Sequence, residues 1–366
     1  MRRTSFAWVR FEMPVLLAFL ALSLLPAVAG PPFPRTIIVP DNYPTIQEAI
    51  NKAAEGDTIF VKKGVYIENP VVNKSVSLVG EDRDSTVIDV TAGLQVQSNN
   101  VTVAGFTIYD GWQGISVSGN GCSILGNKIT DATHGIVLFG FENNITGNIF
   151  RSIGLSSAIQ LNFAHRNLIN KNLIDSCVEG IQIWQNSANN TIAENTITNC
   201  KNTAVSFQYS NNNVAIGNNI TGSALGTSIY GSNRNTISNN NYVYNSVQFG
   251  ANESYYLTFG NNPSINNING NYWSDYHGTD ANGDGIGDSP YIINANHIDQ
   301  YPLMKTVAVS EWSDETSNIP GLPDGSGSND TNEKESFPIS LVVSVSVAVA
   351  AVLAAAGLIY LKKRKH

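Results

Sequence analysis

Charged side chains are scarce in this 366-residue chain. Asp, Glu, Lys and Arg together make up 14% of the residues, whereas they make up about a quarter of an average soluble protein. Coiled coils and long helical bundles need many charged surface positions, so the composition excludes both classes. Cysteine is rare as well, and three cysteines in a chain of this length cannot form a disulfide-rich scaffold.

Basic residues are few in the middle of the chain. Seven of the 21 Lys and Arg residues lie within the first ten or the last five positions. Residues 30–336 therefore contain 14 basic and 28 acidic residues, which leaves a net charge of −14. An acidic surface repels nucleic acid and suits cations or neutral polysaccharides. We expect no nucleic-acid partner.

The first 29 residues predict a secretory signal peptide. Basic residues come first, and an apolar run extends from Val15 to Val28. Ala27, Val28 and Ala29 then form a cleavage site of small residues. An uncleaved membrane anchor is the alternative interpretation of this segment.

The other end of the chain predicts a transmembrane helix. Residues 339–361 carry no charge and are long enough to cross about 30 Å of hydrocarbon. The tail, residues 362–366, is basic, so the positive-inside rule places it in the cytoplasm and the chain before residue 339 outside. Residues 304–338 are rich in Ser, Gly, Asn, Pro and acidic residues, which predicts a disordered linker. We expect a single-pass protein of the cell membrane whose bulk is extracytoplasmic.

Asparagine is frequent, with 45 residues, and it forms sequons for glycosylation. Seven Asn-x-Ser/Thr sequons lie outside the predicted span. They begin at Asn73, Asn100, Asn144, Asn189, Asn219, Asn252 and Asn329. These sequons predict a glycoprotein without identifying the occupied sites.

Asparagine also recurs with a period of 22 to 23 residues. One series consists of Asn144, Asn167, Asn190, Asn213 and Asn235. A second series consists of Asn127, Asn148, Asn172, Asn195, Asn218 and Asn240. Small residues recur in step at Gly114, Gly135, Ala158, Gly180, Ala204 and Gly226. A repeat of this length is typical of a solenoid.

Apolar residues alternate with other residues within each period, as at Ile115 and Val117 or at Ile181 and Ile183. This period of two predicts short strands with one buried face, whereas a helical solenoid would need apolar residues three and four positions apart. Asn tolerates the left-handed conformation of a sharp corner, and stacked amides can bond along a column. Three strands per turn, stacked about 4.8 Å apart, predict an all-β fold, a single-stranded parallel β-helix.

A solenoid needs covered ends. Thr45 and Glu48 fit a capping box, and Gly56 can end the helix that follows. Ile46, Ala49, Ile50 and Ala53 fall on one face of that helix. We predict a short N-terminal capping helix and assign the N-terminal cap and first coils to residues 30–85. The β-helix repeats then occupy residues 86–260, and a C-terminal cap with an Asp-rich loop occupies residues 261–303.

Two segments resemble a known family. The entry segment of pectin-lyase-like right-handed β-helix proteins is similar to residues 36–89, which read TIIVPDNYPTIQEAINKAAEGDTIFVKKGVYIENPVVNKSVSLVGEDRDSTVID. The closing segment of NosD-type, so-called periplasmic copper-binding, β-helix proteins, many of them archaeal surface proteins, is similar to residues 270–304. That part contains GNYWSDYHGTDANGDGIGDSPYII and then IDQYPLM. The resemblance implies a right-handed parallel β-helix but no single activity, because the superfamily includes lyases, hydrolases, epimerases, copper-site maturation factors and binding modules.

The Asp-rich loop has the spacing of a calcium site. The pattern D-x-N-x-D-G-x-x-D places oxygen ligands at alternate positions around one hard cation. These ligands are the side chains of Asp280, Asn282, Asp284 and Asp288 and the carbonyl of Ile286. Tyr291 stands where an EF-hand has its bidentate Glu, so we expect weak affinity unless Asp275 or another residue completes the shell. A surface turn without metal is the alternative.

Copper is the nominal ligand of the family that the closing segment resembles. Copper sites need clustered His, Cys or Met, whereas His134, His165, His277 and His297 are scattered along the sequence. Met304 is the one extracytoplasmic Met of the predicted topology. We expect no copper site.

Acidic and basic residues on successive coils suggest a weak candidate for polysaccharide cleavage. The motifs of pectin-degrading hydrolases, which are adjacent Asp pairs, Gly-His-Gly and Arg-x-Lys, are absent from residues 30–336. The remaining candidates are Asp131, His134, Arg151, Asp175 and Glu179, which occupy neighbouring columns and could share one flank. Scattered, solvated charges are the alternative.

Aromatic residues and cysteines supply two further hypotheses. Phe139, Trp184 and Tyr230 follow the buried alternation in corresponding register and could present stacking platforms for sugar rings, or pack under loops instead. Cys177 and Cys200 each follow a column Asn by five residues, which places them one coil apart and within reach of a disulfide. Two buried free thiols are the alternative.

These patterns favour a membrane-anchored cell-surface module that is structural or binds carbohydrate. A polysaccharide-cleaving enzyme of the lyase or hydrolase kind is the second hypothesis. A copper-site maturation factor is the third.

Overall fold

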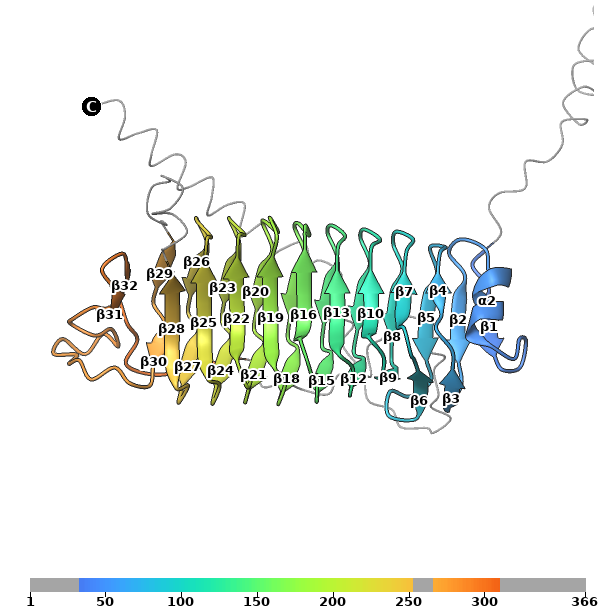
Figure 1. Ribbon diagram of the computed structural model, residues 1–366, viewed down its shortest axis with the longest axis horizontal. Coiled ribbons are helices and arrows are strands. Elements are labelled where there is room, and N and C mark those ends of the chain that lie inside the picture. The colour runs from blue at the N-terminus through green and yellow to red at the C-terminus, as the bar shows by residue number, and fades with distance from the viewer. Residues whose placement is uncertain (1–32, 253–265, 310–366) are drawn as a thin grey trace, which may run out of the picture. The chain divides into compact units, whose positions relative to one another are not determined.

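The computed structural model describes residues 33–252 and 266–309, which form a right-handed parallel β-solenoid of about ten turns (Figure 1). The predicted signal peptide, transmembrane helix and cytoplasmic tail, and most of the predicted linker, lie outside the described residues. Among the described residues, no helix has the length and apolar composition to cross a membrane. The solenoid confirms the parallel β-helix that the 22- to 23-residue period predicts.

Three parallel sheets run along the solenoid, and each complete turn of the chain contributes one strand to each of them in the order A, B, C. Sheet A contains β1 (Thr36–Val39), β2 (Thr58–Val61), β5 (Ser77–Gly80), β8 (Thr102–Ala104), β11 (Ser123–Leu125), β14 (Asn144–Thr146), β17 (Leu168–Asn170), β20 (Thr191–Ala193), β23 (Val214–Ile216), β26 (Thr236–Ser238) and β29 (Asn267–Asn269).

Sheet B contains β3 (Gly64–Ile67), β6 (Thr86–Asp89), β9 (Thr107–Tyr109), β12 (Lys128–Thr130), β15 (Ile149–Arg151), β18 (Leu173–Asp175), β21 (Thr196–Thr198), β24 (Asn219–Thr221), β27 (Asn241–Val243) and β30 (Tyr272–Trp273). Sheet C contains β4 (Val71–Val72), β7 (Leu94–Val96), β10 (Gln113–Val117), β13 (His134–Leu138), β16 (Ser157–Asn162), β19 (Glu179–Trp184), β22 (Thr203–Gln208), β25 (Leu225–Tyr230) and β28 (Val247–Asn252).

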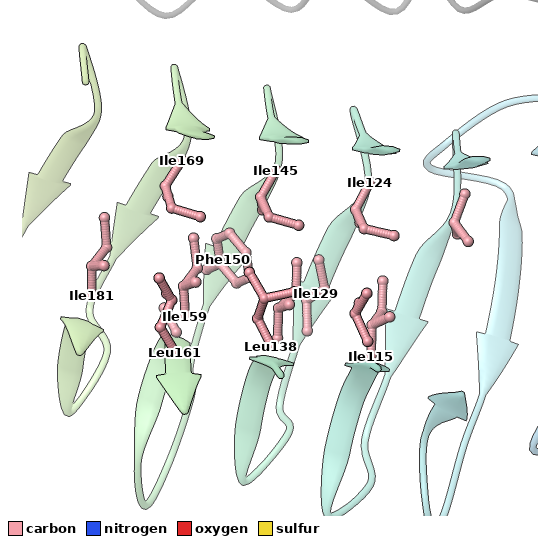
Figure 2. Packing of buried hydrophobic residues seen from close by; sticks show 14 of the residues in the cluster. Ile115, Ile124, Ile129, Leu138, Ile145, Phe150, Ile159, Leu161, Ile169 and Ile181 are labelled. Carbon is pink, nitrogen blue, oxygen red and sulfur yellow. The ribbon is translucent and has the colours of Figure 1, made fainter. Parts of the chain in front are cut away.

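The core consists of aliphatic side chains stacked turn upon turn. Ile124, Ile145 and Ile169 occupy equivalent positions in sheet A and are fully buried (Figure 2). The column of small residues has a steric cause, since a Cβ at Gly135 would lie 2.2 Å from the carbonyl oxygen of Ala158 and 2.8 Å from the ring of Phe150. Small residues at these positions leave room for larger ones such as Phe150 inside the solenoid.

Two columns of buried asparagines bind successive turns together. In the column between sheets A and B, the backbone N–H and the Nδ2 of Asn172 both donate to Oδ1 of Asn195, at 3.0 and 2.9 Å. Nδ2 of Asn172 also donates to the carbonyl of Ile145, at 2.8 Å. The pattern repeats through Asn127, Asn148, Asn172, Asn195, Asn218, Asn240 and Asn271. Each amide thereby satisfies polar groups that the tight corner would otherwise leave buried without partners.

The second column lies between sheets C and A. The sequence predicts Asn144 as its first member, which is wrong by one residue. Asn143, not Asn144, donates to Oδ1 of Asn167, at 2.8 Å from its backbone nitrogen. Asn144 is instead the first residue of β14 and pairs with Leu168. The column continues through Asn167, Asn190, Asn213, Asn235 and Asn266.

A buried carboxylate ends the first asparagine column. Oδ2 of Asp299 accepts from the backbone N–H and the Nδ2 of Asn271 and from the indole nitrogen of Trp273, at 2.9 to 3.1 Å. Oδ1 accepts from the backbone N–H groups of Gly270 and Tyr301. Asp299 lies at the end of β32 (His297–Asp299), which pairs antiparallel with β31 (Tyr291–Asn294). Five donors thus compensate a fully buried carboxylate.

The described part of the predicted C-terminal cap begins with two further strands of the solenoid, because β29 and β30 add to sheets A and B. The ring of Trp273 then stacks between Tyr242 and Tyr291, with centroids 4.5 and 4.3 Å away.

A short helix, α2 (Ile46–Lys52), forms near the first strand, where the sequence predicts one. Thr45 is its N-cap and accepts from the backbone N–H of Glu48, at 3.1 Å. The carboxylate of Glu68 accepts from the N–H groups of Ile46 and Gln47, a contact that the capping-box pattern does not predict. The helix ends at Lys52, before Gly56.

Removing one amide from the column should cost much of the fold's stability. We expect Asn195→Ala to lower the free energy of unfolding by about 3 kcal/mol, because it leaves buried donors on Asn172 without an acceptor. Urea-induced unfolding of the full-length chain measures this change. Asn267→Ala is the matched control, since Asn267 is an exposed strand residue of β29, and it should change stability by less than about 0.5 kcal/mol. Equal effects of the two substitutions would contradict a stabilising role of the column.

Candidate functional site

The outer face of sheet C carries a groove of about 410 Å³. It lies over β16, β19 and β22 and the turns that lead into these strands. Its lining residues are Leu155, Ser156, Gln160, Val178, Glu179, Gln182, Trp184, Asn202 and Gln208. Polar side chains alternate here with core residues such as Ile159 and Ile181, so the strand period itself turns them outward.

Amide side chains form the floor of the groove. Gln160 and Gln182 are paired in register on adjacent turns, and Nε2 of Gln160 donates to Oε1 of Gln182 at 2.7 Å. Gln160 is only 9% exposed, although it lies on the outer face. Trp184 follows Gln182 by two positions and therefore lies on the same face of β19. The arrangement places an aromatic ring beside a floor of hydrogen-bonding groups.

Glu179 is the acidic residue of the groove. Its Oε1 accepts from Nδ2 of Asn202 at 2.9 Å, and its Oε2 lies 3.3 Å from the hydroxyl of Ser157. Burial raises the pKa of Glu179 above its ordinary value of 4.5, although the hydrogen bonds from Ser157 and Asn202 favour the ionised form and oppose this rise. The carboxylate is thus held in place and partly shielded from water.

Two buried polar atoms next to the groove have no hydrogen-bond partner in the described part of the chain. They are Oδ1 of Asn162 and Oγ of Ser206. Asn162 is paired in register with Trp184, and Ser206 with Gln182. Buried polar atoms without partners are uncommon in proteins, and they concentrate where water or a ligand completes the bonding.

The three aromatic residues predicted to bind sugar share one column on sheet C. Trp184 pairs with Asn162 on one side and with Gln208 on the other, and Gln208 pairs with Tyr230. Phe139 directly follows Leu138, which pairs with Leu161, so it holds the same position two turns before Trp184. Trp184 lines the groove, whereas Phe139 and Tyr230 continue the column beyond it.

The structure divides the predicted catalytic residues into two groups. Arg151 and Asp175 are neighbours in register on sheet B. Burial opposes ionisation of Asp175, but hydrogen bonds from Thr198 and Asn199, with a smaller contribution from the charge of Arg151, lower its pKa below the ordinary value. Asp131 lies in the turn after β12, where its carboxylate accepts from Thr130.

His134 and Glu179 belong to sheet C instead, on one column with Ser157 between them. Two turns separate these side chains, about 10 Å at the usual strand spacing. Only Glu179 lines the groove, so the structure does not bring the five residues into one site.

Cys177 and Cys200 are buried and are not bonded to each other in the structure, and each follows a strand of one adjacent pair, β18 and β21. Burial raises the pKa of Cys177 to about 11 and that of Cys200 to about 12, so both are protonated at neutral pH. The disulfide between them stays a prediction.

The Asp-rich loop is a turn closed by its own backbone. Asp280 accepts from the N–H groups of Gly283 and Gly285, at 2.8 and 2.9 Å. Nδ2 of Asn282 donates to Asp284, and Asp288 accepts from the N–H of Ala281. Ile286 forms a bridge with Leu303. Within the described residues, no group of three or more His, Cys, Asp or Glu side chains has the geometry to hold a metal ion.

Three of the four described histidines are also engaged separately. Nδ1 of His134 lies 3.2 Å from the carbonyl of Trp112, and Nδ1 of His165 accepts from the N–H of Ala188. His297 is buried against Asn294. The donor set of the described chain therefore does not fit a copper site, and we derive no copper chemistry from it.

Sequence reasoning missed most of the groove. Gln160, Gln182 and Gln208 are ordinary polar residues of an alternating strand, and Asn202 lies in a turn. One signal was available, because Gln160 and Gln182 hold equivalent places in successive repeats, directly before the aromatic column.

Comparison with known proteins places the chain among β-helices. A family model described as periplasmic copper-binding protein (NosD) matches residues 50–278. A mannuronic acid-specific polysaccharide family 6 lyase from human gut microbiota is 14% identical over 65% of this chain and 75% of the lyase chain, with a TM-score of 0.50. The periplasmic alginate epimerase AlgG is 13% identical over 65% of this chain and 78% of its own, with a TM-score of 0.37. At such identities the likeness concerns the fold alone, and no curated protein matches the chain.

The raised pKa of Glu179 predicts a pH dependence of stability. The folded chain holds this proton more tightly than the unfolded chain, so the stabilisation is fully present below pH 4.5 and is lost as the pH rises through the folded-state pKa. We expect the wild type to lose thermal stability relative to Glu179→Gln as the pH rises above 4.5. Melting curves of both proteins below and above this pH measure the difference.

Glu142→Gln serves as the control, because Glu142 is an exposed surface residue, 63% accessible. It should show no comparable change relative to the wild type. Melting temperatures of Glu179→Gln that run parallel to those of the wild type would contradict the prediction.

Proposed function

The chain belongs to the NosD family, and from this premise we propose that it is an extracytoplasmic protein that binds carbohydrate on the outer face of sheet C. The observation that carries the proposal is the groove in which Trp184 flanks the paired amides of Gln160 and Gln182. Sugar rings stack on aromatic side chains through their C–H faces, while amides and carboxylates bond their hydroxyls. The unpartnered oxygens of Asn162 and Ser206 add bonding capacity next to the groove.

Binding without cleavage is the form of the proposal that the geometry supports. Hydrolysis of a glycosidic bond generally uses two carboxyl groups on either side of it, about 5 to 10 Å apart. Elimination by a lyase needs a base beside the sugar instead, and the described lining residues include no Lys, Arg, His or Tyr. Glu179 is the one carboxylate among the described residues that line the groove. Asp175, four residues earlier, is on sheet B and is bonded to Thr198 and Asn199. We assign Glu179 to hydrogen bonding with the ligand.

We further propose that the protein is exported and anchored. The family is described as periplasmic, and the sequence of residues 1–29 has the features of a signal peptide. The apolar segment 339–361 would then hold the solenoid on the outer side of the membrane, with residues 304–338 as the linker. Helix α2 contacts β1, β2 and β4 and would cover the first turn. The sequons of the exposed turns would then carry glycans.

Calcium binding at residues 280–288 is a second proposal. The loop spacing supports it, and the turn already gathers Asp280, Asn282 and Asp284 through bonds to its own backbone. A bound cation would fasten the end of the stack, because Gly285 and Ile286 contact Leu303 and Met304.

Trp184→Ala should weaken carbohydrate binding at least tenfold, since the ring supplies the stacking surface of the groove. The full-length chain, purified in mild detergent, is first screened on an array of neutral and acidic oligosaccharides, and the strongest ligand is then titrated by calorimetry. Product analysis accompanies the titration, and we expect neither new reducing ends nor unsaturated products.

Tyr244→Ala is the matched control, because Tyr244 is an 80% exposed aromatic residue outside the groove. It should bind as the wild type does. An array without signal would contradict carbohydrate binding, and released products would favour the polysaccharide-cleaving enzyme instead.

Calcium should raise the melting temperature of the full-length chain. At a concentration ten times the Kd the gain is about 1.4 kcal/mol, and extracellular sites bind in the range of about 0.1 to 1 mM. Asp284→Asn should abolish the gain, whereas Asp110→Asn, in an exposed turn elsewhere, should keep it. An unchanged wild-type melting temperature at about 10 mM Ca²⁺ would contradict the proposed site.

A further inference from the structure

The groove is lined by a negative charge and by no positive charge among its described residues. Glu179 is the one charged side chain among its described lining residues, and the remaining polar lining groups are amides, a hydroxyl and the indole N–H of Trp184. The amides and the hydroxyl belong to Gln160, Gln182, Gln208, Asn202 and Ser156. An anionic ligand would therefore enter a partly desolvated space that holds a carboxylate and no cation.

The donors nearest to Glu179 are already in use. Nδ2 of Asn202 donates to one carboxylate oxygen, and the hydroxyl of Ser157 lies within hydrogen-bond distance of the other. A second carboxylate, from a uronic acid, would compete with Glu179 for these donors. A sugar hydroxyl can instead donate to the Glu179 carboxylate and accept from an amide N–H at the same time.

Basic groups lie around the groove but do not reverse its charge. Arg151 on sheet B is the register partner of Asp175. Lys201 is exposed in the turn before Asn202, and His134 is two turns away on the Glu179 column. Residues 30–336 carry a net charge of −14, so the wider field also disfavours an anionic polymer.

We propose that the groove on sheet C selects neutral polysaccharides and rejects those whose sugars carry a carboxylate at C6. The inference rests on the proposed carbohydrate binding and specifies its ligand class. Glu179 acts as the specificity-determining residue, through repulsion of the uronate and through acceptance of hydroxyl donors.

Matched sugar pairs test this inference. The full-length chain in mild detergent is titrated with β-1,4-mannohexaose against β-1,4-hexamannuronate, and with cellohexaose against β-1,4-hexaglucuronate. The members of each pair differ in the C6 carboxylate. We expect the wild type to bind the neutral member at least tenfold more tightly.

Glu179→Gln should lower the ratio of the uronate Kd to the neutral-sugar Kd at least threefold, because it tightens uronate binding. Gln keeps an acceptor for Asn202 but carries no charge. Glu142→Gln, a surface control, should leave the preference unchanged. A second measurement needs no variant: in the wild type, raising NaCl from about 50 to 500 mM should narrow the preference as well, because salt screens the repulsion.

Each outcome has a distinct meaning. Equal or tighter binding of the uronate member would overturn the selectivity while leaving carbohydrate binding intact. A preference that neither Glu179→Gln nor salt changes would overturn the role of Glu179. Binding of none of the four sugars, together with a silent array, would overturn the proposed function itself.

Discussion

The asparagine amide is the group on which the whole solenoid depends. A tight corner turns backbone N–H and C=O groups inward, where water cannot reach them, and every turn of the stack repeats this problem. In the column from Asn148 to Asn271, each amide oxygen accepts two N–H groups of the turn before, and each amide nitrogen donates to the turn after and to a carbonyl. The same chemistry at each layer makes the register of the three sheets uniform.

That uniform register gives sheet C its ordered outer face. Because equivalent positions lie directly above one another, the residues at one outward position form a continuous column along sheet C. Phe139, Trp184 and Tyr230 alternate with amide residues along such a column. Strands therefore position Gln160, Gln182 and Trp184 of the groove, which leaves little ordering of these side chains for a ligand to impose.

Much of the fold could be predicted from the sequence, because period and alternation are local patterns. The exchange of Asn143 and Asn144 shows the limit, since two adjacent asparagines offer the same side chain and only the pairing of β14 with β17 decides between them. The groove could not be predicted. Gln160 looks like any outward polar residue, and its burial depends on the neighbours Gln182 and Glu179 and on the turn that holds Leu155. Candidate catalytic residues lie on two sheets for a related reason. The corner between Asp175 and Glu179 places Asp175 on sheet B and Glu179 on sheet C.

The carboxylate of Asp299 has a consequence beyond stability. An asparagine in its place would accept the same donors from Asn271 but would also present amide hydrogens to the next layer, as every asparagine of the column does. A carboxylate only accepts, so the last layer offers no template on which a further chain could continue the column. A stack of identical layers could continue into a fibre, and the acceptor-only residue at the end of this column gives a following layer no donor to bind.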